Sequence, residues 1–474
     1  MGTATRIGEF GGELILPGDQ TYDRSRAVWN GMVDRRPAAI LRCASPEDVV
    51  SGMRFGREAG LEIAVKCGGH SVLGLSVPNG GVMIDLTPIS AVRIDPVRRK
   101  AWVGGGSLLR NLDEAAQEHG LATTAGNVSH TGVGGLTLGG GMGWLARQFG
   151  LSCDNVEAYT VVTADRRIVH ASESENADLF WGLRGGGGNF GIVTEFEFRL
   201  HPVGGRALVV DLVFDAAEAR DALRGWRDLL PDAPRAATLT ASATTAADLP
   251  STPPGLRNRP IVTVGYVWVG DLNEGLRFLS TIRELGRPAT ERVQEMSYVG
   301  LQCMSDDPNG HGRRRYSKGH YLTELSDAAI DAFLARGLPA SGADPDWSRI
   351  PNGGFQAYGG AIGDVGDDDA AFSHRQTLVE FGCGTNWVDP KEDGDRVSAA
   401  RAYAAALEPF ASGVYVNALG DEGQDGVRRA YPARKLTRLT DLKRLYDPDN
   451  TFHLAICRGL ATRERLRRWR RVRR

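Results

Sequence analysis

A histidine inside a glycine-rich turn is the side chain of this sequence with the clearest chemical potential. His70 lies in the segment 66–71 (Lys-Cys-Gly-Gly-His-Ser), which follows an apolar run, 61–65, typical of a buried strand. Glycines let backbone N–H groups approach a ligand closely, and successive N–H groups in a turn form a concavity that binds anions. A lone histidine is more often structural than functional, so the neighbouring motifs decide between the two interpretations.

Three further glycine clusters follow His70, at 103–106, 132–143 and 185–191, and the middle one holds seven glycines in twelve residues. Ordering glycine is entropically costly, and flexible linkers lack the apolar residues that flank each cluster here. The clusters therefore predict several backbone segments converging on a large, flat, phosphate-bearing ligand. None of them has the Gly-x-Gly-x-x-Gly or Walker pattern at the start of a helix, which argues against a Rossmann or P-loop site.

In their order along the chain, these motifs resemble the bacterial berberine-bridge-enzyme-like FAD-linked oxidases. That family belongs to the vanillyl-alcohol-oxidase and p-cresol-methylhydroxylase (PCMH) flavoprotein superfamily. The resemblance extends from about residue 12 to residue 456, and the set of motifs is far more specific than any one of them. The matching segments are 17–19, 22–23, 29–38, 68–71, 132–143, 151–155, 178–191 and 446–452.

The resemblance implies FAD as the cofactor, attached covalently to His70 through the flavin 8α-methyl group. Many relatives add a second link through a cysteine four residues before the Gly-Val-Gly-Gly run; Val128 stands there, so we expect a single link. Cys67 occupies a position that is usually glycine, and we interpret it as a substitution. No metal site is predicted. The other predicted FAD contacts are Lys66, Cys67, Gly68, Gly69, Ser71, Gly132, Val133, Gly135, Leu136, Gly139, Gly140, Gly143, Asn189, Gly191, Ile192 and Val193.

Relatives oxidise a substrate carbon by hydride transfer to the flavin, usually with a base that takes a proton, and reoxidise the flavin with dioxygen to give hydrogen peroxide. Three positions that supply acid–base residues in relatives are apolar here. Val388 replaces the glutamate that follows an Asn-Trp pair, Ala418 replaces the second tyrosine of Tyr-x-Asn-Tyr, and Met142 replaces a tyrosine of the glycine loop. The candidate catalytic residues that remain are Tyr415, Asn417 and His130, with Asn386 as hydrogen-bonding support.

The position of Thr131 helps to set the access of oxygen in relatives, and a small residue there fits an oxidase. We therefore expect an FAD-dependent oxidoreductase of secondary metabolism that acts on an alcohol, hemiacetal or amine carbon of a small molecule, with dioxygen as the electron acceptor. Two alternatives stay open. One is a flavin dehydrogenase that uses another acceptor. The other is a non-redox flavin-binding cyclase or ligand-binding protein, which the three apolar base positions would suit.

Composition is that of a soluble protein: 474 residues, 42% hydrophobic and 24% charged, with a net charge of −2. No apolar run approaches the length of a membrane span, residues 1–13 lack a signal pattern, and the six cysteines form no Cys-x-x-Cys pair, so we expect reduced thiols and a cytoplasmic protein. The stretch 458–474 has nine arginines and one glutamate, or +8, so the remaining chain carries −10. A solvated basic tail is the commoner interpretation, and the acidic remainder argues against a nucleic-acid partner.

The order of elements predicts an α+β fold, because strands and helices alternate without a repeat. Residues 1–204 form the expected two-subdomain PCMH-type FAD-binding domain, 205–419 a substrate-binding domain, 420–457 a segment that returns to the FAD domain, and 458–474 the basic tail. In the second domain we expect an antiparallel sheet covered on one side by helices. The predicted helices are 47–59, 107–119, 215–230, 272–285 and 396–409, and the predicted strands include 207–214, 260–268, 353–363 and 378–388.

Overall fold

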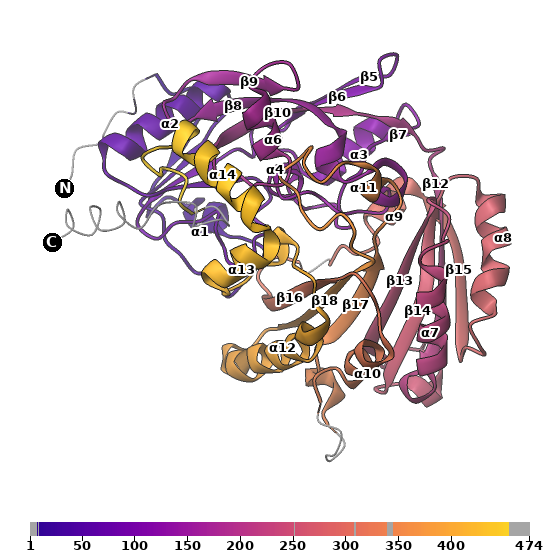
Figure 1. Ribbon diagram of the computed structural model, residues 1–474. Helices are drawn as coiled ribbons and strands as arrows, with labels where there is room; N and C mark the ends of the chain where they lie inside the picture. Colours follow the sequence, from indigo (N-terminus) through magenta and orange to yellow (C-terminus); the bar gives the residue numbers. More distant parts are fainter. Residues whose placement is uncertain (1–6, 8, 251, 308–309, 339–344, 455–474) are drawn as a thin grey trace.

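The computed structural model describes residues 7, 9–250, 252–307, 310–338 and 345–454. The basic stretch 458–474 lies outside these residues. Figure 1 shows an α+β protein in which the first 200 residues or so and the last helices form one body, and a large sheet with its own helices forms a second body beside it. Within the part of the chain that the structure describes, no helix is long and apolar enough to cross a membrane.

The first sheet has four strands in the order β1-β2-β4-β3, with β4 parallel to both β2 and β3. Helix α2 packs on β4 and begins as the sequence predicts, because Ser45 Oγ accepts a hydrogen bond from the Asp48 N–H. The loop that carries His70 leaves the end of β3. The elements of this layer are β1 (Glu13–Ile15), α1 (Tyr22–Arg26), β2 (Ala39–Arg42), α2 (Pro46–Glu58), β3 (Ile63–Lys66) and β4 (Val82–Asp85).

The second sheet has five strands in the order β5-β6-β10-β8-β9, all antiparallel to their neighbours. Strand β10 starts at Gly191, so the third glycine cluster ends at the residue where this strand begins. Strands β7 and β11 pair with each other in a separate two-stranded sheet. The elements of this part of the chain are β5 (Val92–Asp95), β6 (Lys100–Gly104), α3 (Leu109–Gln117), β7 (Leu121–Ala122), α4 (Val133–Leu138), α5 (Ala146–Phe149), β8 (Val156–Thr163), β9 (Ile168–Ser172), α6 (Ala177–Leu183), β10 (Gly191–Arg199) and β11 (His201–Pro202).

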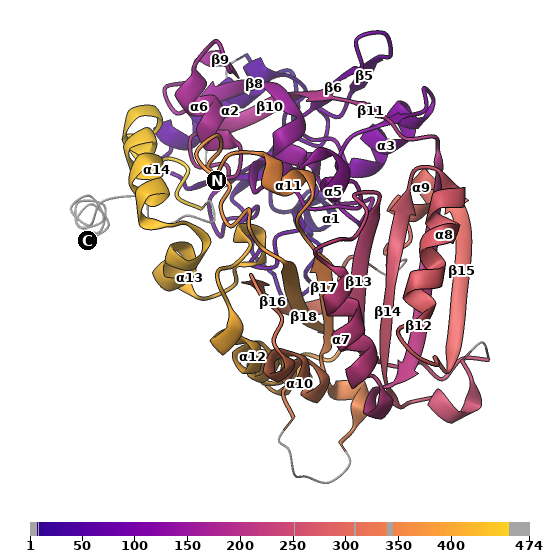
Figure 2. The same ribbon diagram turned by 45° about the vertical axis from the view of Figure 1, so that its right-hand side comes forward.

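The third sheet has seven antiparallel strands in the order β15-β12-β14-β13-β17-β18-β16. Helices α7, α8, α10 and α12 cover one of its faces, as predicted (Figure 2). The elements are β12 (Arg206–Asp215), α7 (Arg220–Leu229), β13 (Ala237–Thr245), β14 (Pro260–Val269), α8 (Leu272–Arg283), β15 (Thr290–Ser297), α9 (Tyr298–Gln302), β16 (Arg314–Leu322), α10 (Asp327–Ala335), β17 (Asn352–Ala357), α11 (Ala361–Asp364), β18 (Val379–Trp387) and α12 (Asp393–Leu407).

The predicted strand 353–363 is too long. Strand β17 ends at Ala357, and the chain then turns through Gly359 and Gly360, whose φ angles are +79° and +56°. These left-handed conformations suit glycine and end an extended strand. The turn leads into α11 and leaves the ring of Tyr358 buried between the two bodies.

The two faces of the large sheet have different partners. In β12, Leu208 and Val210 belong to the core under the helices, whereas Ala207 and Val209 pack with Trp144 from the first body. Alternation of this kind follows from the two-residue period of a strand. The face opposite the helices is therefore the one that meets the glycine loops.

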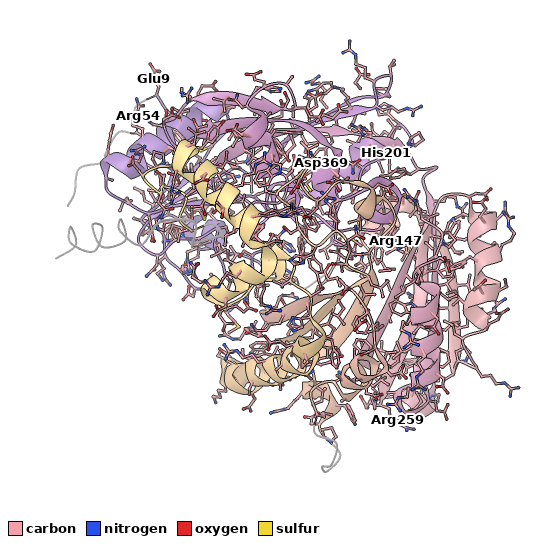
Figure 3. The ribbon with its side chains drawn as sticks, viewed as in Figure 1. Glu9, Arg54, Arg147, His201, Arg259 and Asp369 are labelled. Atoms are coloured by element: carbon pink, nitrogen blue, oxygen red, sulfur yellow. The ribbon has the colours of Figure 1, made fainter. Side chains whose placement is uncertain are left out.

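A buried arginine joins the two bodies. Arg147, in α5, donates hydrogen bonds to the carbonyl oxygens of Ala233, Ala237 and Tyr358, which belong to the second body. Burial lowers the pKa of Arg147 to about 10, so the guanidinium stays charged near neutral pH. Figure 3 shows Arg147 between the two layers of ribbon. These three hydrogen bonds fix the position of the large sheet relative to the glycine loops.

The chain returns to the first body at its C-terminal end. Helices α13 (Gly423–Ala430) and α14 (Ala433–Tyr446) follow the large sheet, and Leu439 and Leu442 share a core with Phe196 of β10. After α14, the carboxylate of Asp447 accepts hydrogen bonds from the N–H groups of Thr451 and Phe452. That turn directs Phe452 toward the first sheet, where it packs in the core of β2 and β4.

Candidate active site

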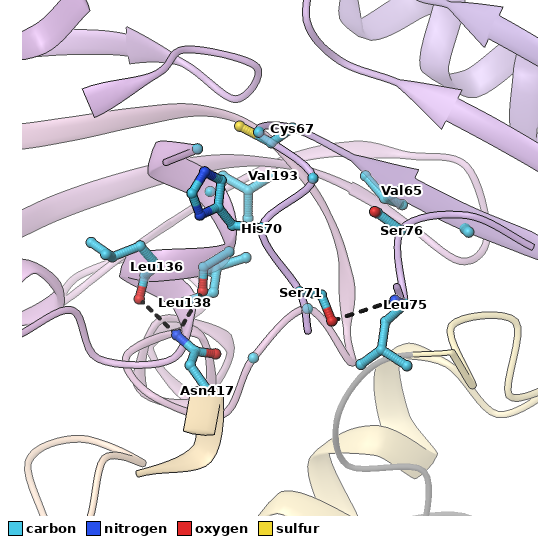
Figure 4. A pocket seen from close by; sticks show the side chains of 18 of the residues that line it. Val65, Cys67, His70, Ser71, Leu75, Ser76, Leu136, Leu138, Val193 and Asn417 are labelled. Atoms are coloured by element: carbon cyan, nitrogen blue, oxygen red, sulfur yellow. Dashed lines mark hydrogen bonds between the residues drawn. The ribbon is translucent and has the colours of Figure 1, made fainter. Parts of the chain in front are cut away.

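A cavity of about 340 Å³ lies where the glycine loops, the end of β3 and the segment before α13 meet. Figure 4 shows its walls, with the His70 loop facing Leu136, Leu138 and Asn417. The lining comes from segments that are far apart in the sequence. They are 63–65, 67–72, 75–76, Leu86, Gly105, 131–132, 134–136, Leu138, 187–188, 191–193, 415–417, Leu419, Phe452 and Leu454.

Most residues predicted to hold a cofactor line this cavity. The structure brings together there Cys67, Gly68, Gly69, His70, Ser71, Gly132, Gly135, Leu136, Gly191, Ile192, Val193, Tyr415 and Asn417. It places Lys66, Val133, Gly139, Gly140, Gly143, Asn189 and His130 outside the lining.

The glycines of the middle cluster serve two different purposes. A Cβ atom on Gly139 would lie 2.3 Å from the amide nitrogen of Asn417, and one on Gly143 would lie 1.5 Å from the carbonyl oxygen of Ala125. These two positions are glycine because other protein groups pack on them. A Cβ on Gly135 would meet no atom within 4 Å, so only this part of the cluster presents open backbone to the cavity.

Two predicted contact residues are engaged with the protein itself. The ammonium group of Lys66 donates to the carbonyl oxygen of Ser25 at 2.6 Å. The amide of Asn189 donates to the carbonyl oxygen of Gly186, also at 2.6 Å, and so fixes the third glycine turn. Both side chains hold loops that line the cavity, but neither side chain is itself part of the lining.

His70 is tightly held. Its ring stacks on Trp29, with the ring centroids 4.9 Å apart and an angle of 16° between the planes. Its Nε2 lies 2.7 Å from Nδ1 of His130, and its Nδ1 lies 3.3 Å from Oγ1 of Thr131. Burial, together with the neighbouring His130, His311 and Arg315, lowers the pKa of His70 to about 3. His70 is therefore a neutral imidazole near pH 7, with one nitrogen free to act as a nucleophile.

Cys67, in contrast to His70, is held in a form that is a poor nucleophile. Its Sγ donates toward the carbonyl oxygen of Ser107 at 3.3 Å, and burial raises the pKa of the thiol to about 11. The reactive form of cysteine is the thiolate. A protonated Cys67 is a poor nucleophile even though it lines the same cavity as His70.

Tyr415 and Asn417 form one hydrogen-bonded unit at the cavity wall. The Tyr415 hydroxyl oxygen accepts hydrogen bonds from the Gly141 N–H and the Asn417 amide, each at 3.0 Å. The same amide donates to the carbonyl oxygen of Gly135 at 3.1 Å and to that of Leu136 at 3.4 Å, and Figure 4 shows Asn417 facing Leu136. Burial raises the pKa of Tyr415 above its ordinary value. With its acceptor sites filled, the phenol can act only as a donor to a bound ligand.

Sequence reasoning missed a partly buried carboxyl group on the large sheet. Glu380, in β18, accepts a hydrogen bond at 2.7 Å from Tyr358, whose hydroxyl lies 3.2 Å from that of Tyr321. Burial raises the pKa of Glu380 to about 7. A Cβ on Gly382, the next residue on the same face, would meet no atom within 4 Å, so open space lies beside the carboxyl.

A signal for Glu380 is present in the sequence. Along β18 the apolar Val379, Phe381 and Cys383 face the helices, and they alternate with Glu380, Gly382 and Gly384. Between residues 380 and 384, the second face therefore carries one carboxylate and otherwise only glycine. A strand with this pattern marks a polar group beside a hollow.

The three positions where relatives carry acid–base residues hold no titratable group in the structure either. Val388 is 72% exposed at the end of β18. Ala418 packs near Gly319, and Met142 is buried against Tyr321, Tyr358 and Phe372. Asn386 is exposed on β18.

Comparison with known proteins gives a consistent result. Residues 37–172 match the FAD binding domain family. An FAD-linked oxidoreductase of Dictyostelium discoideum is 29% identical over 454 residues, which is 93% of each chain. The (R)-6-hydroxynicotine oxidase of Paenarthrobacter nicotinovorans is also 29% identical, over 93% of this chain and 95% of its own.

Solved structures agree with these relatives. The 6-hydroxy-D-nicotine oxidase of Arthrobacter nicotinovorans superposes with a TM-score of 0.84 and 26% identity, over 96% of this chain and 99% of that one. A glucooligosaccharide oxidase of Acremonium strictum, described as having a novel flavinylation, superposes with a TM-score of 0.81 and 25% identity, over 93% and 94% of the two chains.

Fold and cavity together define an FAD-binding protein of the PCMH type. Residues 37–172 belong to the FAD binding domain family, and over 93% of its length the chain is similar to FAD-linked oxidoreductases. It is an oxidoreductase, and its cofactor is FAD. The cavity fits that cofactor, because the open backbone at Gly135, Gly187 and Gly188 gives a flat group access while His70 lies in the same wall.

Proposed function

We propose that the protein is an oxidase that carries FAD on His70 and oxidises an alcohol, hemiacetal or amine carbon of a small organic molecule. The observation that carries the proposal is a neutral, partly buried imidazole in a glycine cradle, which supplies a nucleophilic nitrogen at physiological pH. FAD, when bound there, supplies the two-electron acceptor. The oxidation of 6-hydroxynicotine and of glucooligosaccharides by the two named relatives supports the choice of amine and hemiacetal carbons.

In this proposal, the residues of the large sheet manage the proton. Glu380, with a pKa near 7, accepts the proton that leaves the substrate oxygen or nitrogen. Tyr358 holds Oε2 of this carboxylate, and Tyr415 donates a hydrogen bond that orients the substrate. Dioxygen is the electron acceptor, and the small side chain of Thr131 beside His70 leaves room for its approach.

Flavin attachment tests the anchor without a substrate. The wild type, His70→Ala and the exposed control His119→Ala are compared by intact-protein mass and by flavin absorbance after acid precipitation. We expect a shift of one FAD and a yellow pellet for the wild type and His119→Ala, and a colourless pellet for His70→Ala. A shift that persists in His70→Ala would move the anchor to another residue, and Cys67 would be the first to replace.

Turnover tests the reaction. Peroxide release and anaerobic bleaching of the flavin are measured with 6-hydroxynicotine, glucooligosaccharides and other amines and alcohols. For the wild type we expect bleaching that air reverses, and for Glu380→Gln a decrease in kcat of about 100-fold or more with unchanged flavin content. Bleaching that air reverses only slowly would indicate a dehydrogenase. Product without bleaching would indicate a non-redox reaction.

A further inference from the structure

Three glycines of the large sheet are required neither by backbone conformation nor by packing. Gly354, in β17, and Gly382 and Gly384, in β18, do not have a positive φ. A Cβ atom on Gly382 would meet no atom within 4 Å, and on Gly354 and Gly384 its nearest neighbours would lie at 3.6 Å and 3.5 Å, which is ordinary van der Waals contact. Gly353 differs from them, because a Cβ there would lie 2.2 Å from the Tyr403 hydroxyl. The three open glycines could therefore each carry a side chain.

The approach of a ligand is a physical reason for glycine at these positions. Glycine in the interior of a strand is less stable than a residue with a side chain, and it often marks a place where a ligand comes close to the backbone. Gly382 is exposed, so a ligand has access to it. The stability that a side chain would add is absent where a ligand needs the space.

The register of the strands brings the open glycines together. Gly354 pairs with Gly382, and Gly382 pairs with Gly319 of β16; Figure 2 shows the three strands side by side. Neighbouring strands lie about 4.8 Å apart, so this row is about 10 Å wide, and Gly384 on the same face extends it by about 7 Å along β18. These four glycines form a flat surface, the glycine floor, which has the dimensions of one or two rings.

The glycine floor lies on the face of the sheet that meets the first body. Tyr321 and Arg315 are on the same face of β16 as Gly319, because they are separated from it by even numbers of residues. The ring centroid of Tyr321 lies 6.5 Å from that of Tyr415, which lines the cavity, and the Arg315 guanidinium lies 4.1 Å over the ring of Trp29, the stacking partner of the anchor histidine. The floor is therefore adjacent to the cofactor cavity.

Neutral polar residues border the floor. Ser242 pairs with Gly354, and Asn352 and Ser317 pair with Gly384 from either side. In the described sheet, no residue paired with these glycines carries a charge. Hydroxyl and amide groups both donate and accept hydrogen bonds, so they match the hydroxyl groups of a neutral ligand.

We propose that the glycine floor is a subsite for a second ring of the substrate, a neutral ring with hydroxyl groups that lies flat on β17 and β18 beside the carbon that is oxidised. Gly382 is the next residue after Glu380 on this face, so the second ring lies next to the proposed proton acceptor. The inference rests on the proposed function and narrows its substrates to molecules of at least two rings. A sugar ring and a hydroxylated aromatic ring share this chemistry.

Pairs of substrates that differ by one ring test the subsite. One pair is D-glucose and cellobiose, and the other is 4-hydroxybenzyl alcohol and 6-hydroxynaphthalene-2-methanol. The kcat and KM for each are obtained from peroxide release by the FAD-loaded wild type, Gly382→Leu, which fills the floor, and Gly394→Leu. The last is the matched control, because Gly394 is exposed in the first turn of α12 and also has nothing within 4 Å of its Cβ position.

We expect the wild type to prefer the two-ring member of the pair it oxidises by about 10-fold or more in kcat/KM, mainly through a lower KM. In Gly382→Leu this preference should be lost, because kcat/KM falls at least about 10-fold further for the two-ring member than for the one-ring member. Gly394→Leu should behave as the wild type does. Equal kcat/KM for the two members in the wild type, or an unchanged preference in Gly382→Leu, would overturn the inference.

A smaller side chain guards against misfolding. Should Gly382→Leu not bind FAD, Gly382→Ala and Gly354→Ala decide in its place, and we expect their urea midpoints to equal or exceed that of the wild type while the two-ring preference falls by about threefold or more. An unchanged preference in both would overturn the subsite.

Failure of the subsite and failure of the proposed function give different results. A wild type that oxidises 6-hydroxynicotine but no member of the two pairs would overturn the subsite and leave the oxidase in place. A wild type whose flavin no substrate reduces would refute the proposed function, and the subsite with it.

Discussion

The loop wall of the cavity and the sheet wall, which is the part of the large sheet outside the cavity lining, are built in different ways. The loop wall takes its lining residues from 67–72, 131–138 and 187–193 and consists mainly of backbone and small residues supplied by three continuous motifs. The sheet wall offers single side chains, Tyr321, Tyr358 and Glu380, from three different places in the chain. A wall made of backbone leaves glycine clusters that are visible in the sequence. A wall made of side chains leaves single residues that only the fold connects.

The largest expected effect concerns the two kinds of glycine in the loop wall, those packed against other protein groups and those open to the cavity. A Cβ on Gly143 would lie 1.5 Å from the carbonyl oxygen of Ala125, so we expect Gly143→Ala to lower the free energy of unfolding by about 3 kcal/mol or more. Gly135 lies within α4 and has open space beside it, so Gly135→Ala should stabilise the FAD-free protein by about 0.5 kcal/mol and weaken FAD binding. Urea unfolding and FAD titration measure the two effects.

Equal stability of the two variants would contradict the distinction between packed and ligand-facing glycines. Normal FAD affinity in Gly135→Ala would show that the open side of α4 faces something other than the cofactor. Gly60, which has no atom near its Cβ position, is an unsuitable control because its φ is +64°. Gly394, in the first turn of α12 and with nothing within 4 Å, is the better one.

Sequence predicts the parts of the fold in which local pattern and burial agree. Strands β12 and β14 have apolar residues at successive positions, and the Ser45–Pro46 cap marks the start of α2. Strand β15 was not predicted, because it is an edge strand that is almost wholly exposed and rich in charged residues. Strand β16 was missed for another reason: its site-facing residues are polar or glycine, so function interrupts the hydrophobic alternation.

The same limit applies to the site. The anchor and its cradle could be found because the motifs around His70 are continuous. The pattern of β18 marks Glu380 as a polar group between glycines, but its role depends on its hydrogen bond from Tyr358 and on the raised pKa that desolvation gives it, and these appear only in three dimensions. His130 was predicted in the catalytic set from its position in the loop, whereas its contact with Nε2 of His70 appears only in three dimensions.

Replacing Glu380 should have an effect of intermediate size, and it separates the contribution of this residue to stability from its contribution to activity. Burial raises the pKa of Glu380 from 4.5 to about 7 in the folded protein. Its protonated form is therefore favoured by folding, and the stabilisation is complete below about pH 4.5 and is lost as the pH rises through 7. We expect Glu380→Gln to match the wild type at pH 5 and to exceed it in free energy of unfolding by about 2 kcal/mol at pH 8.5.

Asp113 provides the matched control. Burial raises its pKa to about 7 as well, and it accepts a hydrogen bond from Gln302 at 3.0 Å, but it lies on α3, not on the large sheet that carries Tyr321 and Glu380. Asp113→Asn should show the same pH-dependent gain in stability with an unchanged pH profile of kcat. Glu380→Gln should lose the part of the profile that rises near pH 7. A changed activity profile in Asp113→Asn would mean that the pH dependence reports folding and not the site.

The smallest effect should come from restoring the residue that relatives use. Glutamate directly after the Asn-Trp pair would stand at Val388, which is 72% exposed at the end of β18. A carboxylate there is solvated, so its pKa should be ordinary and Val388→Glu should change the free energy of unfolding by no more than about 0.5 kcal/mol. Activity should be unchanged, and Val388→Glu combined with Glu380→Gln should remain as slow as Glu380→Gln alone. Recovery of kcat in the double variant would place the substrate at the end of β18 and would remove the proton-accepting role from Glu380.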